Sequence, residues 1–160
     1  MSSGFFEFPI SSSACLFCKI AQNIESSYKI FEDEISISFL DIRPLFLGHS
    51  LLIPKKHFQT LSDLPQQLVA RFFTNIQLLS RAVELGLRAE GSFVAINNRI
   101  SQSVPHLHVH IVPRRKKDGF RGFFWPRQTY RDQHEILRIQ EILRSVILQI
   151  KGANSTENLR

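Results

Sequence analysis

The chain lacks the sequence features of a membrane protein or a secreted one. No apolar run in its 160 residues approaches the roughly 18 residues that a membrane-spanning helix needs. The N-terminus does not have the basic-then-apolar order of a secretory signal peptide, and no sequence unit repeats. We therefore expect a soluble, cytoplasmic protein with one domain, because a chain of this length can bury a core without disulfide bonds.

Cysteine is scarce, and the only two, Cys15 and Cys18, form a C-x-x-C pair. In a chain without secretory signals, this spacing indicates half of a metal site or a redox pair rather than a disulfide framework. Zinc binds thiolate and imidazole ligands in tetrahedral geometry, but no histidine pair follows at zinc-finger spacing. His57 and His106 are the candidates to complete such a site. The alternative is a pair of inert, buried thiols.

Acidic residues are nearly absent from the segment 114–131, which we call the basic segment. It holds seven basic residues against Asp118 alone and accounts for the whole net charge of +6. Such a segment attracts anions, phosphates above all, and its aromatic rings are suited to base stacking. The alternative is a solvated loop that its aromatic residues pin to the domain.

Half of the six histidines alternate with aliphatic residues in P-H-L-H-V-H-I-V-P, residues 105–113. Alternation of this length predicts a strand, residues 104–112, with the imidazoles on one face and the aliphatic side chains buried on the other. Neighbouring imidazoles would then be about 6–7 Å apart. The row can carry a catalytic zinc, offer a nucleophilic imidazole to phosphorus, or be an incidental polar face.

Hydrophobic periodicity elsewhere predicts an α+β domain, with about five antiparallel strands and two main helices on one face of the sheet. The expected strands are 28–31, 35–40, 49–54, 92–97 and 104–112. The expected helices are a short one at 15–21 and two long ones at 63–87 and 133–151.

Several boundaries follow from the same patterns. Ser62 or Asp63 is expected to cap the first long helix, and Gly86 or Gly91 to end it. Alternation in 35–40 predicts a sheet with one face better buried than the other. Residues 1–14 and 152–160 are expected to be tails on either side of a domain at 15–151.

The motif His106-Leu107-His108-Val109-His110-Ile111-Val112 resembles the signature of the histidine triad (HIT) superfamily. The likeness continues upstream in family order and covers roughly residues 15–115. Its further segments are C-L-F-C-K-I at 15–20, F-L-D-I at 39–42, G-H-S-L-L-I-P-K-K-H at 48–57 and Q-S-V-P at 102–105.

The resemblance implies a HIT-like fold and a hydrolase or transferase that acts at the α-phosphate of a nucleotide. It assigns His108 as the nucleophile that forms a nucleotidyl-histidine intermediate, with His110 and His49 on the phosphate oxygens. The transferase branch typically carries glutamine at the place of His110, so hydrolysis is favoured. The ribose, base, phosphate and leaving group would be bound by Asp41, Ile42, Asn97, Gln102 and Ser103.

The resemblance also implies a homodimer and a structural zinc ion, the latter held by Cys15, Cys18, His57 and His106. The expected substrates are dinucleoside polyphosphates or phosphoramidates of AMP. The basic segment favours the former, because it can bind a long polyphosphate. Residues 98–101 are shorter than in many relatives and lack glycine, so the leaving-group side is expected to be shaped differently. The alternative is a non-catalytic nucleotide or nucleic-acid binding module that uses the basic segment.

Overall fold

The computed structural model describes residues 14–120 and 128–157, and five strands in these residues form one sheet. Every neighbouring pair is antiparallel, as predicted. The order across the sheet is β1-β2-β3-β5-β4. The strands are β1 Lys29–Glu32, β2 Ser36–Leu40, β3 Ser50–Pro54, β4 Gly91–Ile96 and β5 Val109–Arg114.

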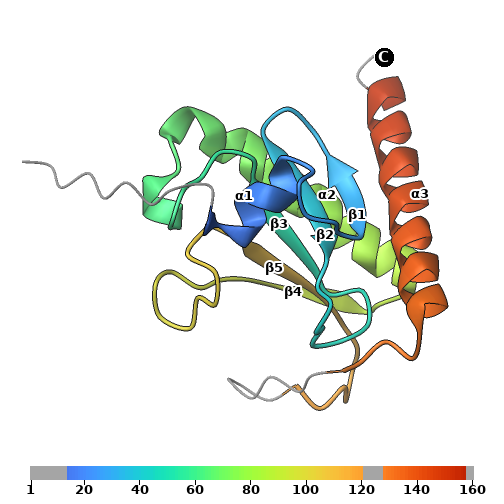
Figure 1. Cartoon of the computed structure of the whole chain (residues 1–160). Helices are drawn as coiled ribbons and strands as arrows, with labels where there is room; N and C mark the ends of the chain where they lie inside the picture. The colour runs from blue at the N-terminus through green and yellow to red at the C-terminus, as the bar shows by residue number, and fades with distance from the viewer. Residues whose placement is uncertain (1–13, 121–127, 158–160) are drawn as a thin grey trace, which may run out of the picture.

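Three α-helices pack on this sheet: α1 Leu16–Ala21, α2 Gln66–Leu87 and α3 Gln133–Glu157. The long helix α2 covers one face, α3 runs beside β1 and against α2, and the short α1 lies on the opposite face (Figure 1). The two main helices therefore lie on one face, as predicted. No helix in the described ranges combines the length and apolar character needed to cross a bilayer.

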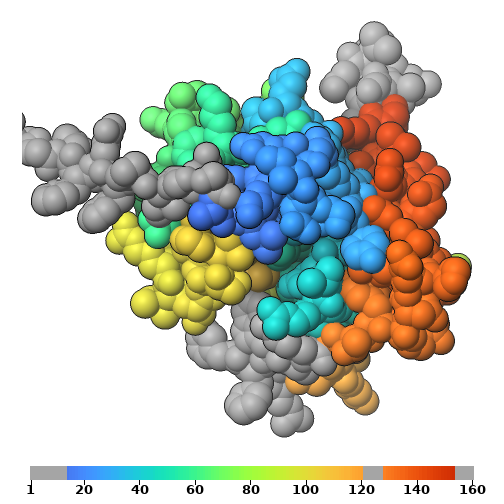
Figure 2. Space-filling view, in the orientation of Figure 1, coloured from blue at the N-terminus to red at the C-terminus, as the bar shows by residue number. Residues whose placement is uncertain are grey.

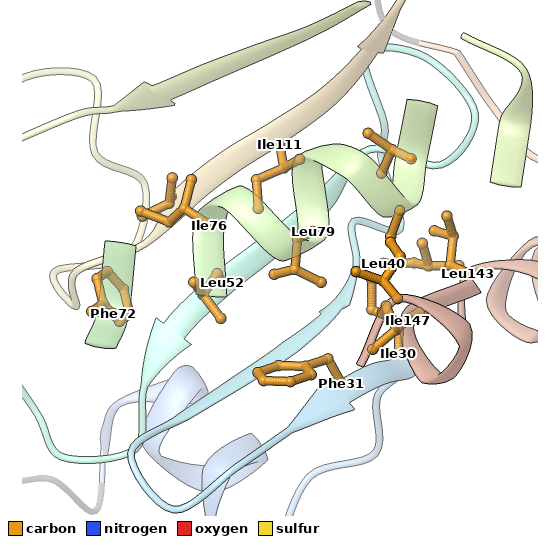
Figure 3. Close-up of a cluster of buried hydrophobic side chains, with 14 of the residues drawn as sticks. Ile30, Phe31, Leu40, Leu52, Phe72, Ile76, Leu79, Ile111, Leu143 and Ile147 are labelled. Atoms are coloured by element: carbon orange, nitrogen blue, oxygen red, sulfur yellow. The ribbon is translucent and has the colours of Figure 1, made fainter. Parts of the chain in front are cut away.

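The main core lies between the sheet and the two long helices. Leu52 of β3 and Ile111 of β5 meet the apolar stripe of α2, which includes Phe72, Ile76 and Leu79 (Figure 3). Further buried residues of α3, among them Leu143 and Ile147, close this layer beside β1. Burial of an apolar stripe of this kind is the main source of stability for an amphipathic helix.

A second, smaller core lies on the other face, under α1. There Phe17 and Ile20 of the helix pack with Ile37 and Phe39 of β2. All five residues of β2 are consequently buried, so the prediction of one poorly buried face is wrong at this strand. The serine face, which the alternation alone left open, is covered by α2, whose Asn75 donates a hydrogen bond to Ser36, while α1 covers the face of Ile37 and Phe39.

Several predicted boundaries also need correction. Asp63 caps a separate 3₁₀ turn, η2 Leu61–Asp63, through a reciprocal capping box with Thr60. Helix α2 begins only after Pro65 and ends at Leu87, and its C-cap residue Arg88 takes a left-handed conformation with φ of 51°. Gly86 lies inside the helix, where α3 packs closely against it.

At the last strand and the last helix, the predicted ends were also displaced. Regular pairing of β5 starts at Val109, not at residue 104, because residues 103–106 form a bend. Helix α3 continues past Lys151 to Glu157. The tail at 1–14 falls almost wholly outside the described residues, which begin at residue 14.

Candidate active site and metal centre

A cavity of about 750 Å³ opens on the face of the sheet that carries α1. Its recess is visible between α1 (blue), the loop that follows β2 (cyan) and the loop that follows β4 (yellow) (Figure 2). His49, His108 and His110 line it. Leu16, Phe17 and Ile20 of α1 add an apolar wall, which sequence reasoning missed. The signal available was the apolar spacing within the C-L-F-C-K-I segment.

The predicted division of faces in the triad motif is confirmed. Leu107, Val109 and Ile111 lie in the core beside α2, whereas the rings of His108 and His110 line the cavity on the other side. The centroids of these two rings are 5.0 Å apart, closer than the roughly 6–7 Å expected along a strand. Strand geometry does not fix this distance, because His108 precedes the regular part of β5.

His108 is held by a hydrogen bond on one nitrogen. Its Nδ1 lies 2.7 Å from the backbone carbonyl oxygen of His106. Because a carbonyl oxygen only accepts, Nδ1 must carry the proton, and Nε2 keeps its lone pair. Burial lowers the pKa of His108 below its usual range, which favours the neutral ring. The ring of Phe17 packs edge-on against it with centroids 5.3 Å apart.

His49 and His110 form a second hydrogen-bonded pair beside it. The backbone N–H of Leu45 donates to Nδ1 of His49 over 3.2 Å, so Nε2 of His49 carries that ring's proton. This Nε2 lies 3.0 Å from Nδ1 of His110 and donates to it. The remaining nitrogen of His110, Nε2, is then a donor. The pair thus provides an N–H group suited to an anionic oxygen.

The structure places four of the five predicted substrate residues on the cavity wall: Asp41, Ile42, Asn97 and Ser103. The side chain of Ile42 is 68 % exposed at the rim of the cavity, so it offers apolar surface that a ligand can bury. The fifth, Gln102, is not among the residues that line the cavity. Its side-chain amide is bonded to backbone groups instead.

The four predicted metal ligands come together on the same side of the sheet. Their donor atoms all lie within 4.8 Å of one another. Nδ1 of His106 is 3.5 Å from each of the two sulfurs, and Nδ1 of His57 is 3.2 Å from Sγ of Cys18. A tetrahedral zinc site, with bonds of roughly 2.0–2.3 Å, separates its ligands by about 3.3–3.8 Å. The side chains therefore fit a zinc ion.

The protonation state of His106 suits metal binding, whereas the Cys18 thiol would have to lose its proton. Nε2 of His106 lies 2.9 Å from the carbonyl oxygen of Pro54 and donates to it, which leaves Nδ1 free to coordinate. Burial lowers the pKa of His106 to about 4. Burial, followed by the hydrogen bond with Cys15, raises the pKa of the Cys18 thiol to about 11. A bound cation would lower the pKa of the Cys18 thiol instead, because thiols lose their proton on coordination.

Several cations in the described part of the basic segment pair with acids and carbonyl groups. Arg114 forms a two-bond ion pair with Asp118, at 2.6 and 2.9 Å, and stacks on Phe120. Arg115 donates to the carbonyl oxygens of Leu87 and Arg88. These contacts favour the pinned-loop interpretation for residues 114–120. Residues 121–127, which include Phe123, Phe124 and Trp125, lie outside the described residues, and nucleic-acid binding stays a prediction.

The comparison with known families decides the classification. The sequence profile of the HIT domain matches residues 22–117. The chain belongs to the HIT family. This HIT protein is 36 % identical, over 89 % of its own chain and 99 % of the other, to a zinc-bound histidine triad family protein from Mycobacterium smegmatis, with a TM-score of 0.78.

Two curated relatives carry names that describe an activity. Adenylylsulfatase HINT3 of Arabidopsis thaliana is 36 % identical over 65 % of this chain, and the match spans 54 % of that longer protein. Adenosine 5′-monophosphoramidase HNT1 of Saccharomyces cerevisiae is 29 % identical over 89 % of this chain and 86 % of its own. At the level of the family, these relatives support nucleotide hydrolysis.

Proposed function

We propose that this HIT protein hydrolyses nucleoside 5′-phosphate derivatives at the α-phosphate, with His108 as the nucleophile. The observation that carries the proposal is the bond from Nδ1 of His108 to the carbonyl oxygen of His106, 2.7 Å long. It leaves the lone pair of Nε2 on a neutral ring that lines the cavity. Nucleophilic histidines need this combination of a fixed tautomer and a free lone pair.

The reaction has two displacements. In the first, Nε2 of His108 forms a bond to the α-phosphorus as the bond from phosphorus to the leaving group breaks, and the leaving group departs with the bonding electron pair and gains a proton. In the second, water attacks the phosphorus and releases a proton to solvent, the Nε2–P bond breaks with its electron pair returning to Nε2, and the mononucleotide leaves. Charge on the phosphoryl oxygens is stabilised by the Nε2–H group of His110, which His49 orients.

For the substrate, we propose a nucleotide with a small leaving group, such as an AMP phosphoramidate or adenylylsulfate. The names of the two curated relatives support this class. The apolar wall from α1 suits a nucleobase, and Asp41 and Ile42 lie beside it for the ribose and the base. Dinucleoside polyphosphates remain the rival class, although Arg114 and Arg131 of the basic segment already pair with Asp118 and Glu135.

We further propose that Cys15, Cys18, His57 and His106 hold a structural zinc ion. The short distances among their donor atoms and the zinc-bound relative support this. With all four positions filled by protein, the ion would join α1 to the segments around His57 and His106 and would take no part in the chemistry. We also propose a homodimer; β4 lies at one edge of the sheet that the described residues form, and an edge strand can pair with a strand of a second copy.

A substrate panel tests the proposed activity. Purified protein is given AMP phosphoramidate, adenylylsulfate and diadenosine polyphosphates, and release of mononucleotide is measured. We expect AMP from the first two substrates, and a loss of about 10⁴-fold or more in His108→Asn, as for removal of other nucleophiles. His134→Ala is the matched control, because His134 is exposed at the start of α3. Equal activity in His108→Asn and the parent protein would refute the proposal.

A further inference from the structure

We propose that Gln102 is a positioning residue for the nucleophile rather than a ligand of the substrate. Its side-chain amide fixes the peptide group between His106 and Leu107, whose carbonyl oxygen holds the Nδ1 proton of His108. This inference rests on the proposed function, in which His108 attacks phosphorus. The inference concerns the tautomer and orientation of His108 in the free protein, so it can be tested without substrate turnover.

Both polar atoms of the Gln102 side-chain amide, Nε2 and Oε1, form hydrogen bonds with the backbone. Its Nε2 donates to the carbonyl oxygen of Gln59 over 2.7 Å and to that of His106 over 3.3 Å. Its Oε1 accepts from the backbone N–H of Arg99 over 2.8 Å. A glutamine amide has two donor hydrogens, and both have backbone partners. Since Gln102 is also absent from the cavity wall, its contacts point to the protein and not to a ligand.

These bonds hold one peptide plane from both sides. The N–H of Leu107 donates to the carbonyl oxygen of Phe58 over 2.6 Å. On the other side of the plane, the carbonyl oxygen of His106 accepts from both Gln102 and His108, and a carbonyl oxygen has two lone pairs for this purpose. Segment 58–59 thus anchors the N–H directly and the C=O through Gln102. Rotation of the plane would break three hydrogen bonds together.

The unusual loop before the triad brings Gln102 into this position. Arg99 and Ser101 both adopt left-handed conformations, with φ of 66° and 59°, although neither is glycine. The side chain of Asn98 accepts from the N–H of Leu61 over 2.8 Å, and Gln102 holds the N–H of Arg99. The loop is therefore tied to the segment that carries Gln59. Its conformation is coupled through Gln102 to the nucleophile.

The experiment compares Gln102→Ala and Gln102→Glu with Gln140→Ala as the matched control. Gln140 is also partly buried and donates its amide to one backbone carbonyl, that of Lys29, over 2.8 Å, but on α3. The Gln102→Glu side chain can still accept from Arg99, yet it cannot donate to His106. The tautomer of His108 is read by ¹⁵N NMR without substrate, and kcat and KM are measured with AMP phosphoramidate.

We expect both Gln102 variants to shift His108 partly toward the Nε2–H tautomer. They should lower kcat by roughly 2- to 10-fold, the effect of one neutral hydrogen bond, with KM unchanged within experimental error. Gln140→Ala should change neither quantity. If Gln102→Ala fails to fold, Gln102→Glu, which keeps the side-chain volume, supplies the same comparison.

An unchanged His108 tautomer in both variants overturns the proposal, as does a raised KM with unchanged kcat, which is the result expected for a direct substrate ligand. The proposed function can fail separately. If the parent protein hydrolyses no member of the substrate panel, the NMR comparison still decides whether Gln102 sets the tautomer of His108.

Discussion

The backbone carbonyl oxygen of His106 accepts a hydrogen bond from Nδ1 of His108 over 2.7 Å, while the imidazole of His106 lies 3.5 Å from both sulfurs of the C-x-x-C pair. One residue therefore belongs to the proposed metal centre through its side chain and to the proposed catalytic site through its backbone. Disturbance of the metal centre should consequently reach the nucleophile. The two sites are parts of one structural unit.

Metal content is the first prediction. Protein purified without chelator should contain about one zinc ion per chain, by the logic of a four-ligand structural site. Removal of the ion should lower the free energy of unfolding by about 3–5 kcal/mol, a modest share of what structural zinc can contribute. Because each kcal/mol shifts Tm by about 2–4 °C in a protein of this size, Tm should fall by roughly 10 °C. Elemental analysis and calorimetry measure both. A metal-free protein with unchanged Tm after chelation would contradict the assignment.

Gly48 provides a stability test of the loop that leads into His49. Its φ is 93°, and an added Cβ would overlap the side chain of Leu87 at the end of α2. We expect Gly48→Ala to reduce the free energy of unfolding by about 2–4 kcal/mol, from overpacking and the left-handed backbone together. Gly91→Ala is the control, because no atom lies within 4 Å of its added Cβ. Urea denaturation that finds both variants equally stable would contradict this packing.

Asp33 gives a prediction on pH. Burial opposes its ionisation, but hydrogen bonds from Asn75, Ser36 and Ile35 outweigh burial and lower its pKa below 3.8. A carboxyl whose pKa is lower in the folded state stabilises the fold above its unfolded pKa, and this contribution disappears as pH falls through the folded value.

The variant Asp33→Asn should therefore be less stable than the parent protein at pH 7, by about 1–3 kcal/mol for lost bonds to a charged acceptor. The difference should shrink as pH falls below about 4, the unfolded pKa of an aspartate. Urea titrations at several pH values measure it. Glu34→Gln is the control, because the Glu34 side chain is 81 % exposed, and it should change the free energy of unfolding little at any pH. If the stability difference between Asp33→Asn and the parent protein grew as pH falls, the pKa of Asp33 would not be lowered by folding.

Much of the site could be predicted from the sequence, because its residues lie in segments with strong periodicity. The alternation around His108 placed the imidazoles and the aliphatic side chains on the correct faces, although regular strand pairing begins later. The C-x-x-C pair and its two histidine partners met as expected. The alternation reflects a single element, in which the spacing along the chain fixes direction, whereas the meeting of Cys15 and Cys18 with His57 and His106, which lie in separate segments, was implied by the resemblance to the HIT superfamily.

What the sequence could not supply came from contacts between distant segments. The burial of β2 on both faces depends on α1 on one side and on α2 on the other, and the pattern of β2 alone cannot show both. Likewise, Gln102 stands in a motif that resembles a substrate-binding segment, but its partners Gln59 and Arg99 are set by the loop conformation. Asp63 was expected to cap the long helix, but it completes a capping box with Thr60 on η2, because α2 begins only after Pro65.

The central claim is that His108 forms a covalent bond to the nucleotide, and trapping this intermediate tests it most directly. The protein is mixed rapidly with AMP phosphoramidate and quenched in alkaline denaturant, and its peptides are analysed by mass spectrometry, with His108→Asn and His134→Ala in parallel. The account predicts one nucleotidyl group on His108 in the parent protein and in His134→Ala, and none in His108→Asn. Substrate consumption with no adduct at any time point, or an adduct on another histidine such as His110, would contradict it.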